Sequence, residues 1–232
     1  MKNFTLKLLA VTSLLLSSCA SNPPIEERRS ALSSAKTIAI VSSGAESLGI
    51  DYLGFTVFNN VKQVVDVSSW GMDKKIFDEA IKGLKGRFDV VLTETWPELA
   101  PINYAPAKDR GLRSDLGGQV LQPYVERVLQ RKPVDLVLFI LARGDKALNV
   151  ISGRPGLNGD SIVVPITLTV YDAKTKREIY GTHPSEKCEV IVFNFKTSDL
   201  SAEVARNRLT LEQASLRCFT KHFSKFSREA GL

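Results

Sequence analysis

Few side chains of this chain can act as nucleophiles, redox centres or metal ligands. It contains three cysteines and two histidines. His183 and His222 are not spaced with thiols or carboxylates as a closed zinc shell requires, so we expect no metal and no cofactor. Cys188 and Cys218 could form a disulfide in an oxidising compartment, worth about 3 to 4 kcal/mol in the chain-entropy model. Two separate buried thiols are the alternative, and the sequence leaves both open.

The third cysteine, Cys19, follows a segment typical of a secretory signal. Lys2 and Lys7 come first, and an apolar core from Leu8 to Leu16 then leads into two serines. Such a core is too short to cross a bilayer, which needs about 20 apolar residues. We therefore expect a signal peptide and no retained transmembrane helix.

The residues Leu16-Ser17-Ser18-Cys19 resemble the lipobox of bacterial lipoproteins. The resemblance implies cleavage before Cys19 and acylation of its sulfur and amine, and several acyl chains hold a protein stably on a membrane. An Asp after the cysteine resembles an inner-membrane retention signal, and Ala20 in its place favours the outer membrane. The alternative is a plain signal peptide in which Cys19 is incidental or pairs with another cysteine.

These features divide the chain into a lipoprotein signal peptide (1–18), a lipidated tether (19–36) and a single α/β domain (37–232). The tether contains Asn22-Pro23-Pro24 followed by charged residues, and has little to bury. Cleavage would remove Lys2 and Lys7 and leave 29 Lys and Arg against 25 Asp and Glu, a net charge of +4. That excess is too small to indicate nucleic-acid binding.

Two kinds of hydrophobic period run through the first part of the domain. Apolar residues at three- and four-residue steps predict helices from Met72 to Gly86 and from about Leu116 to Leu129. Asn59-Asn60 predicts a hairpin turn between two strands. Short runs rich in β-branched or apolar residues predict strands at 37–41, 53–58, 61–67, 88–94 and 134–141. Because strands and helices alternate, we expect a parallel core, with the last strand covered on both faces.

The last part of the domain has a different pattern. Residues 162–171 alternate, which predicts a half-exposed strand, and Pro165 indicates an edge or a bulge. Asp172–Lys176 then predicts a turn into an antiparallel partner, and a long helix begins at about Ala202. The fold class is α/β, a mixed sheet with a parallel central part, an antiparallel hairpin at each end of the chain and a long C-terminal helix.

This order of elements resembles the small α/β domains of envelope lipoproteins and assembly factors related to the TolB amino-terminal domain. The resemblance covers most of residues 36–225. It depends on the Thr37–Val41 strand, the Leu53–Val67 hairpin and the Val134–Leu141 strand, and it implies no individual functional residue.

Ligands of open α/β sheets bind outside the carboxyl ends of the strands. Three loops leave such ends here, at 42–49, 95–114 and 143–160, and two of them are unusually long. If the strands are parallel, these loops share one edge, which we call the rim. The candidate ligand or partner residues on the rim are Ser43, Glu46, Trp96, Tyr104, Arg113, Arg143 and Asp145. The alternative is that these loops are only variable surface.

The C-terminal helix is predicted to have a basic face and an aromatic face. Phe219, Phe223 and Phe226 lie on one side. The cations of the other side are Arg217, Lys221, Lys225 and Arg228. They are either the solvated side of a helix that packs on the sheet, or a surface for anionic headgroups or an acidic partner.

Together these observations predict a lipid-anchored cell-envelope protein that faces the periplasm. We expect a non-catalytic binding or assembly factor at the membrane surface, because no motif supplies a nucleophile with its base. The alternative is a small-ligand-binding protein or hydrolase that uses the three rim loops. The expected partners are the membrane, through the lipid anchor, and an envelope protein, without nucleic acid.

Overall fold

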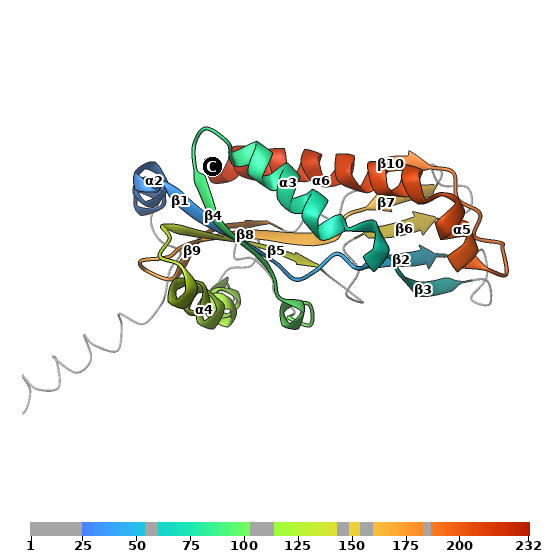
Figure 1. The fold of residues 1–232 in the computed structure, drawn as a ribbon, viewed down its shortest axis with the longest axis horizontal. Helices are drawn as coiled ribbons and strands as arrows, with labels where there is room; N and C mark the ends of the chain where they lie inside the picture. Colours follow the sequence, from blue (N-terminus) through green and yellow to red (C-terminus); the bar gives the residue numbers. More distant parts are fainter. Residues whose placement is uncertain (1–24, 54–59, 103–113, 143–148, 154–159, 183–186) are drawn as a thin grey trace, which may run out of the picture.

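The computed structural model describes residues 25–53, 60–102, 114–142, 149–153, 160–182 and 187–232, and within them the strands form two five-stranded sheets (Figure 1). Sheet A contains, in spatial order, β4 (Asp89–Thr95), β1 (Thr37–Ser42), β5 (Leu136–Ala142), β8 (Ile166–Asp172) and β9 (Arg177–Thr182). Sheet B contains β10 (Lys187–Ile191), β7 (Asp160–Val163), β6 (Asn149–Gly153), β2 (Ser47–Tyr52) and β3 (Val61–Asp66). The predicted α/β class, with its parallel central strands, is confirmed, but the sequence did not predict two sheets.

Sheet A has a parallel part and an antiparallel part. Strands β4, β1 and β5 are parallel, whereas β8 and β9 run antiparallel to their neighbours. Every residue of β5 is buried, as we expected for a strand covered on both faces. The turn Asp172–Lys176 joins β8 to β9 as predicted.

Sheet B shows where the predicted hairpin was wrong in detail. Its first strand is β2, which pairs with β3 from Ser47 opposite Asp66 to Tyr52 opposite Val61. Strand β2 therefore lies in a segment that we predicted to be part of a rim loop, and the predicted strand at 53–58 falls mostly outside the described residues. Leu48 and Ile50 explain why a strand forms at 47–52. Both side chains are buried in the core, and residues two apart face the same side only in an extended segment.

The chain crosses directly between the sheets at two places. Strand β1 of sheet A leads into β2 of sheet B, and β7 of sheet B leads into β8 of sheet A. The second crossing occurs at Val164–Pro165, where the proline interrupts the alternating segment. The predicted half-exposed strand was wrong, since Thr167 and Thr169 are as fully buried as their apolar neighbours. The helix at residues 114–131 covers that face of β8, because Tyr171 on the same face shares a core cluster with Leu121 and Val125.

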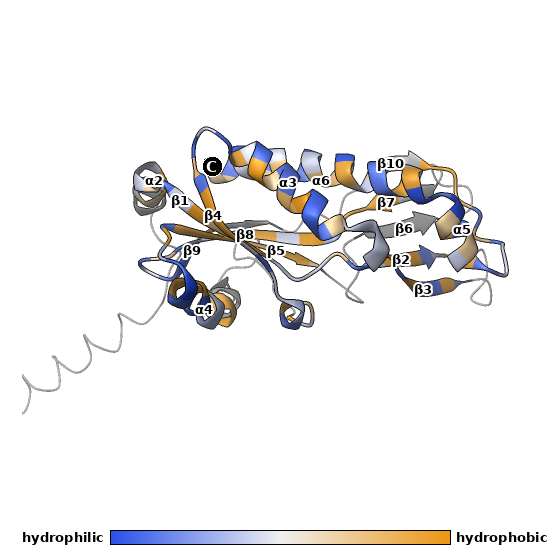
Figure 2. Cartoon of the chain, viewed as in Figure 1, coloured by the Kyte–Doolittle hydropathy of each residue, from blue (hydrophilic) through white to orange (hydrophobic). Residues whose placement is uncertain are grey.

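The helices form two unequal layers (Figures 1 and 2). Helices α3 (Met72–Leu84) and α6 (Arg208–Ala230) pack against each other over one face, and α6 reaches strands of both sheets. Helix α4 (Ser114–Arg131) covers the opposite face of sheet A. Helix α2 (Ile25–Ser34) precedes β1. None of the described helices is both long enough and apolar enough to cross a bilayer.

The predicted single C-terminal helix is divided at Asn207. Helix α5 (Leu200–Arg206) begins where the Asp199 carboxylate accepts a hydrogen bond from the Ala202 amide at 2.9 Å. It ends where the Asn207 side-chain amide donates to the Glu203 carbonyl at 3.0 Å and carboxylate at 2.8 Å. An asparagine side chain that binds nearby backbone in this way competes with helix continuation.

Candidate functional site

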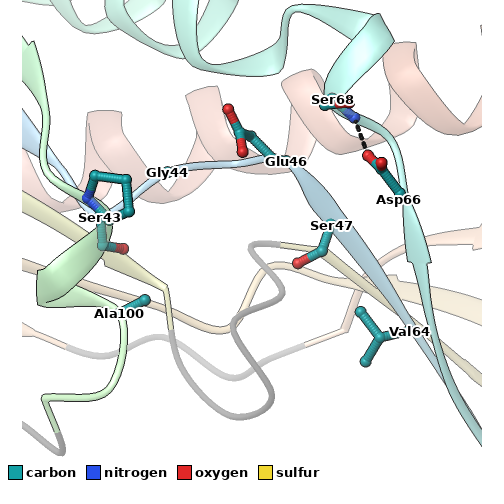
Figure 3. Close-up of a pocket in the computed structure, with 9 residues that line it drawn as sticks. Ser43, Gly44, Glu46, Ser47, Val64, Asp66, Ser68 and Ala100 are labelled. Carbon is teal, nitrogen blue, oxygen red and sulfur yellow. Dashed lines mark hydrogen bonds between the residues drawn. The ribbon is translucent and has the colours of Figure 1, made fainter.

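A cleft of about 530 Å³ lies at the junction of the two sheets (Figure 3). Its walls come from the crossing between β1 and β2, from β3 with the short 3-10 helix η3 (Ser68–Trp70), and from η4 (Pro97–Leu99). The lining residues are Ser43, Gly44, Glu46, Ser47, Val64, Asp66, Ser68, Pro97 and Ala100. The cleft therefore adjoins the carboxyl ends of β1 and β4, where the topology rule predicts a ligand site.

The wall at the end of β1 is fixed by backbone hydrogen bonds. The amide of Ser43 donates to the Ile140 carbonyl at 3.0 Å, and the Ser43 hydroxyl accepts from the Ala142 amide at 2.7 Å. Gly44 follows with φ +103°, a backbone conformation that L side chains rarely adopt. Ser43 thus joins β1 to β5, and we assign it a positioning role in the cleft wall.

The wall formed by η4 is held from behind by Trp96. This side chain is only 3% exposed, and its ring lies 4.2 Å from the Arg127 guanidinium carbon of α4. The indole N–H donates to Glu94 at 2.6 Å, and Arg131 donates to the same carboxylate at 2.5 Å. Burial opposes the charged form of Glu94, but these two hydrogen bonds lower its pKa. The prediction that Trp96 is a ligand residue on the rim is therefore wrong, because its ring belongs to the core.

Carboxylates give the cleft a negative character. Asp66 accepts a hydrogen bond from the Ser68 amide at 2.8 Å, and this contact lowers the pKa of Asp66. Behind the lining, burial raises the pKa of Asp73, and the charge of Glu46 raises it further. The described lining contains no lysine, arginine or histidine. The cleft can therefore accept hydrogen bonds and attract positive charge.

Two of the predicted rim residues line the cleft, and their role in binding stays a prediction. Ser43 and Glu46 meet η4 there, as expected for loops that leave neighbouring parallel strands. The other four predicted rim residues lie outside the described residues: Tyr104, Arg113, Arg143 and Asp145. The supposed loops at 42–49 and 143–160 were too long, because they contain the start of β2 and the whole of β6.

Sequence reasoning missed the wall contributed by β2, β3 and η3. Ser47, Val64 and Asp66 lie on one face of the hairpin, because Ser47 is opposite Asp66 and Val64 is two residues away along β3. The sequence of residues 61–66 does not alternate and gives no signal for this face, although Val65 is buried and Val64 is exposed. The register with β2 was needed to place that exposed face beside Ser43.

Two of the three cysteines form a crosslink. Cys188 in β10 and Cys218 in α6 are joined by a disulfide with 5.3 Å between their Cα atoms, so of the two alternatives the structure has the pair. His222 Nε2 lies 2.9 Å from Cys188 Sγ, and the three side chains could hold a metal only as free ligands. Disulfide sulfurs are not thiolates, so this arrangement stabilises the fold and is not a metal centre.

The C-terminal helix has the two faces that the sequence predicts. Phe219, Phe223 and Phe226 are buried, with ring centroids 5.7 Å apart for the first pair and 6.2 Å for the second. The four predicted cations are exposed: Arg217, Lys221, Lys225 and Arg228. This arrangement agrees with a solvated helix face and equally with a surface for an anionic partner. Cys19 lies outside the described residues.

Comparison with known proteins gives structural neighbours only. No family model and no curated protein matches the chain. A Xanthomonas campestris protein of the DUF330 family aligns at TM-score 0.37 and 9% identity, over 84% of this chain and 86% of its own. A hypothetical Chlamydia trachomatis protein aligns at 0.39 and 10%, over 83% and 98%. A Helicobacter pylori homolog of the neuraminyllactose-binding hemagglutinin aligns at 0.29 and 10%, over 84% and 90%.

These similarities are too low to carry an argument about function. The resemblance to TolB amino-terminal domains also stays a prediction.

Proposed function

We propose that this chain is a lipid-anchored cell-envelope protein, on the outer membrane facing the periplasm, that binds a ligand or partner in the inter-sheet cleft without catalysis. The lipobox-like sequence supports the anchor through Cys19. The observation that carries the binding role is the cleft itself, because it has the volume of a small-ligand site and is lined by serines, carboxylates and one exposed valine.

The lining favours binding over hydrolysis. A serine nucleophile needs a base that accepts its proton, and the hydrogen bond that the structure describes for the Ser43 hydroxyl is with the Ala142 amide, which is a donor and cannot act as a base. The described lining contains no histidine or cysteine. A hydrolase using the rim loops therefore remains the second candidate, and it has no support from the described residues.

The chemistry of the lining also indicates the kind of ligand. Glu46 and Asp66 are exposed carboxylates, and Ser47 adds a hydroxyl group. Such groups select ligands that present amines, guanidinium groups or other hydrogen-bond donors. We expect a cationic small molecule or a basic peptide segment of an envelope protein to bind here.

A site-specific photo-crosslink tests the cleft. A photoreactive residue at Val64, 44% exposed in the cleft, should capture the ligand in native membranes, whereas the same residue at Val192, 94% exposed outside it, should not. Mass spectrometry of the purified protein identifies the adduct. Ser47→Arg, which fills the cleft and offsets part of its negative charge, should remove the adduct from position 64. Equal adducts at positions 64 and 192, or an adduct unaffected by Ser47→Arg, would contradict a site in the cleft.

A further inference from the structure

The layer formed by α3 and α6 has a basic half. Six exposed cations lie at the end of α3 and along α6 from its middle onward: Lys82, Lys85, Arg217, Lys221, Lys225 and Arg228. Arg217 and Lys221 share a hollow of about 470 Å³ with Glu79 between the helices, so the cations of α6 are neighbours of α3. We call this surface the basic layer.

Residues 78–85 and 217–229, which carry these cations, also carry three carboxylates: Asp78, Glu79 and Glu229. Asp78 pairs with Lys74 at 2.9 Å. Glu79 accepts a hydrogen bond from Thr220 at 3.0 Å and lies 3.8 Å from Lys82. Glu229 accepts a hydrogen bond from the hydroxyl of Tyr180 at 2.5 Å. On these stretches of the described chain the six cations outnumber the three carboxylates, and the surface fits an anionic occupant.

Helix α2, which belongs to the tether, contacts the C-terminal end of α6. A Cβ atom at Gly231 would lie 3.8 Å from a methyl group of Leu32, so the end of α6 contacts α2. Five residues lie between Cys19 and Ile25, the first residue of α2, and the six steps of chain span at most about 20 Å when extended. An acylated Cys19 would thus hold the basic layer close to the bilayer.

Part of the cleft lining lies on the face of sheet B opposite the basic layer, and the rest adjoins the start of α3, at the opposite end of that helix from Lys82. Leu48 and Val65 point into the core that α3 and α6 cover, whereas Ser47 and Val64 belong to the opposite face of the same hairpin. Figure 1 shows α3 and α6 on one side of both sheets and η4 on the other side. Contact of the basic layer with a surface would therefore leave the cleft accessible.

We propose that the body lies on anionic lipid headgroups through the basic layer, which leaves the cleft accessible. This orientation rests on the proposed lipid anchor at Cys19, since the tether brings the layer to the membrane. Each basic side chain near an anionic bilayer strengthens association about fivefold, so the layer adds a second attachment to the acyl chains. The free energy is electrostatic, so high salt weakens it.

Lysine acetylation of the lipidated protein in vesicles tests the orientation. With vesicles that contain phosphatidylglycerol, Lys82, Lys85, Lys221 and Lys225 should react several-fold more slowly than with vesicles of phosphatidylcholine alone. Lys174 and Lys196, which are exposed elsewhere, should react equally in both. The same mass spectra report whether Cys19 carries acyl chains.

Two charge-reversal variants with equal net charge provide the matched comparison. Lys85→Glu with Lys221→Glu and Lys225→Glu should weaken the electrostatic attachment about 100-fold and remove the protection of Lys82. Lys132→Glu with Lys174→Glu and Lys196→Glu should leave Lys82 protected. An acylated protein whose Lys82 reacts equally in both vesicles overturns the orientation alone. Missing acyl chains overturn the proposed anchor, and the orientation with it.

Discussion

Sheets A and B are built from similar strands but differ in what covers them. In sheet A, α3 and α6 cover one face and α4 covers the other, and Phe139 and Tyr171 pack edge to face beneath α4. In sheet B the hairpin of β2 and β3 has an exposed face with Val64 and Asp66, and the cleft begins there. We infer that the doubly covered sheet contributes more to stability, whereas the sheet with an open face offers side chains to a ligand.

The largest contrast should come from truncating one apolar side chain in each sheet. Phe139→Ala leaves a cavity in a fully buried site, and we expect it to lower the free energy of unfolding by about 3 to 5 kcal/mol. Val64→Ala in the open face should change it by less than about 0.5 kcal/mol. Urea unfolding followed by circular dichroism measures both. Similar losses for the two variants would mean that the open face is covered in solution.

The disulfide tests how sheet B is held to the helices. Cys188→Ala with Cys218→Ala opens a loop of sequence separation 30, and we expect a loss of about 3 to 4 kcal/mol. Amide hydrogen exchange should accelerate in β10 and β7 more than in β5, because the crosslink joins the edge of sheet B to α6. The wild-type protein under reducing conditions should behave like the double variant. Uniform acceleration in both sheets would contradict this local role.

A glycine at the contact of α3 with α6 gives a smaller effect. A Cβ atom at Gly83 would lie 2.9 Å from a ring carbon of the buried Phe223. We expect Gly83→Ala to cost about 1 to 2 kcal/mol, because overpacking outweighs the better helix propensity of alanine. In a Phe223→Leu background the same change should be neutral or stabilising. Thermal unfolding of the four proteins in this cycle provides the measurement.

A still smaller effect should come from Asp135, which lies directly before β5 at the amino-terminal end of the parallel strands. Its carboxylate accepts hydrogen bonds from the Lys36 amide at 2.8 Å and the Thr37 amide at 2.9 Å, and these contacts lower the pKa of Asp135. A lowered pKa stabilises the fold above the unfolded value of about 3.9, and this contribution is lost as the pH falls through the folded value.

Asp135→Asn removes that contribution and keeps one acceptor oxygen. We expect a loss of about 0.5 kcal/mol at pH 7, because the group is exposed and solvent screens it, and no difference below both pKa values. Asp66→Asn in sheet B should show the same sign, since the Ser68 amide lowers the pKa of Asp66. Free energies of unfolding measured at neutral and acidic pH compare the two sheets, and an effect that grows in acid would contradict the mechanism.

The periodic segments of the chain could be predicted from the sequence because local spacing determines them. Helix α3 was predicted at 72–86 and lies at Met72–Leu84, and the apolar run of β5 was placed within two residues at its start. The division into two sheets could not be predicted, because contacts between distant residues determine it. The hydroxyl of Ser43, for example, binds the amide of Ala142, a sequence separation of 99.

The cleft was predictable only as far as one topological rule reaches. The rule for carboxyl ends of parallel strands identified Ser43 and Glu46, but Asp66 needed the register of β3 with β2. Trp96 was misplaced because an aromatic residue after a strand can be a ligand contact or a core anchor. Its burial against Arg127 of α4 shows that it is a core anchor, and a contact with a residue so distant in sequence cannot be predicted from a local pattern.

Helix α6 limits the movement of the two sheets during ligand binding. Its 23 residues form a rod of about 35 Å that spans both sheets, and two strands of sheet A pass directly into strands of sheet B. Sheets A and B are therefore not expected to move toward each other around a bound ligand, as the two domains of a hinged binding protein do. Recognition would have to depend on a preformed shape, with capture limited by diffusion and not by a slow conformational step.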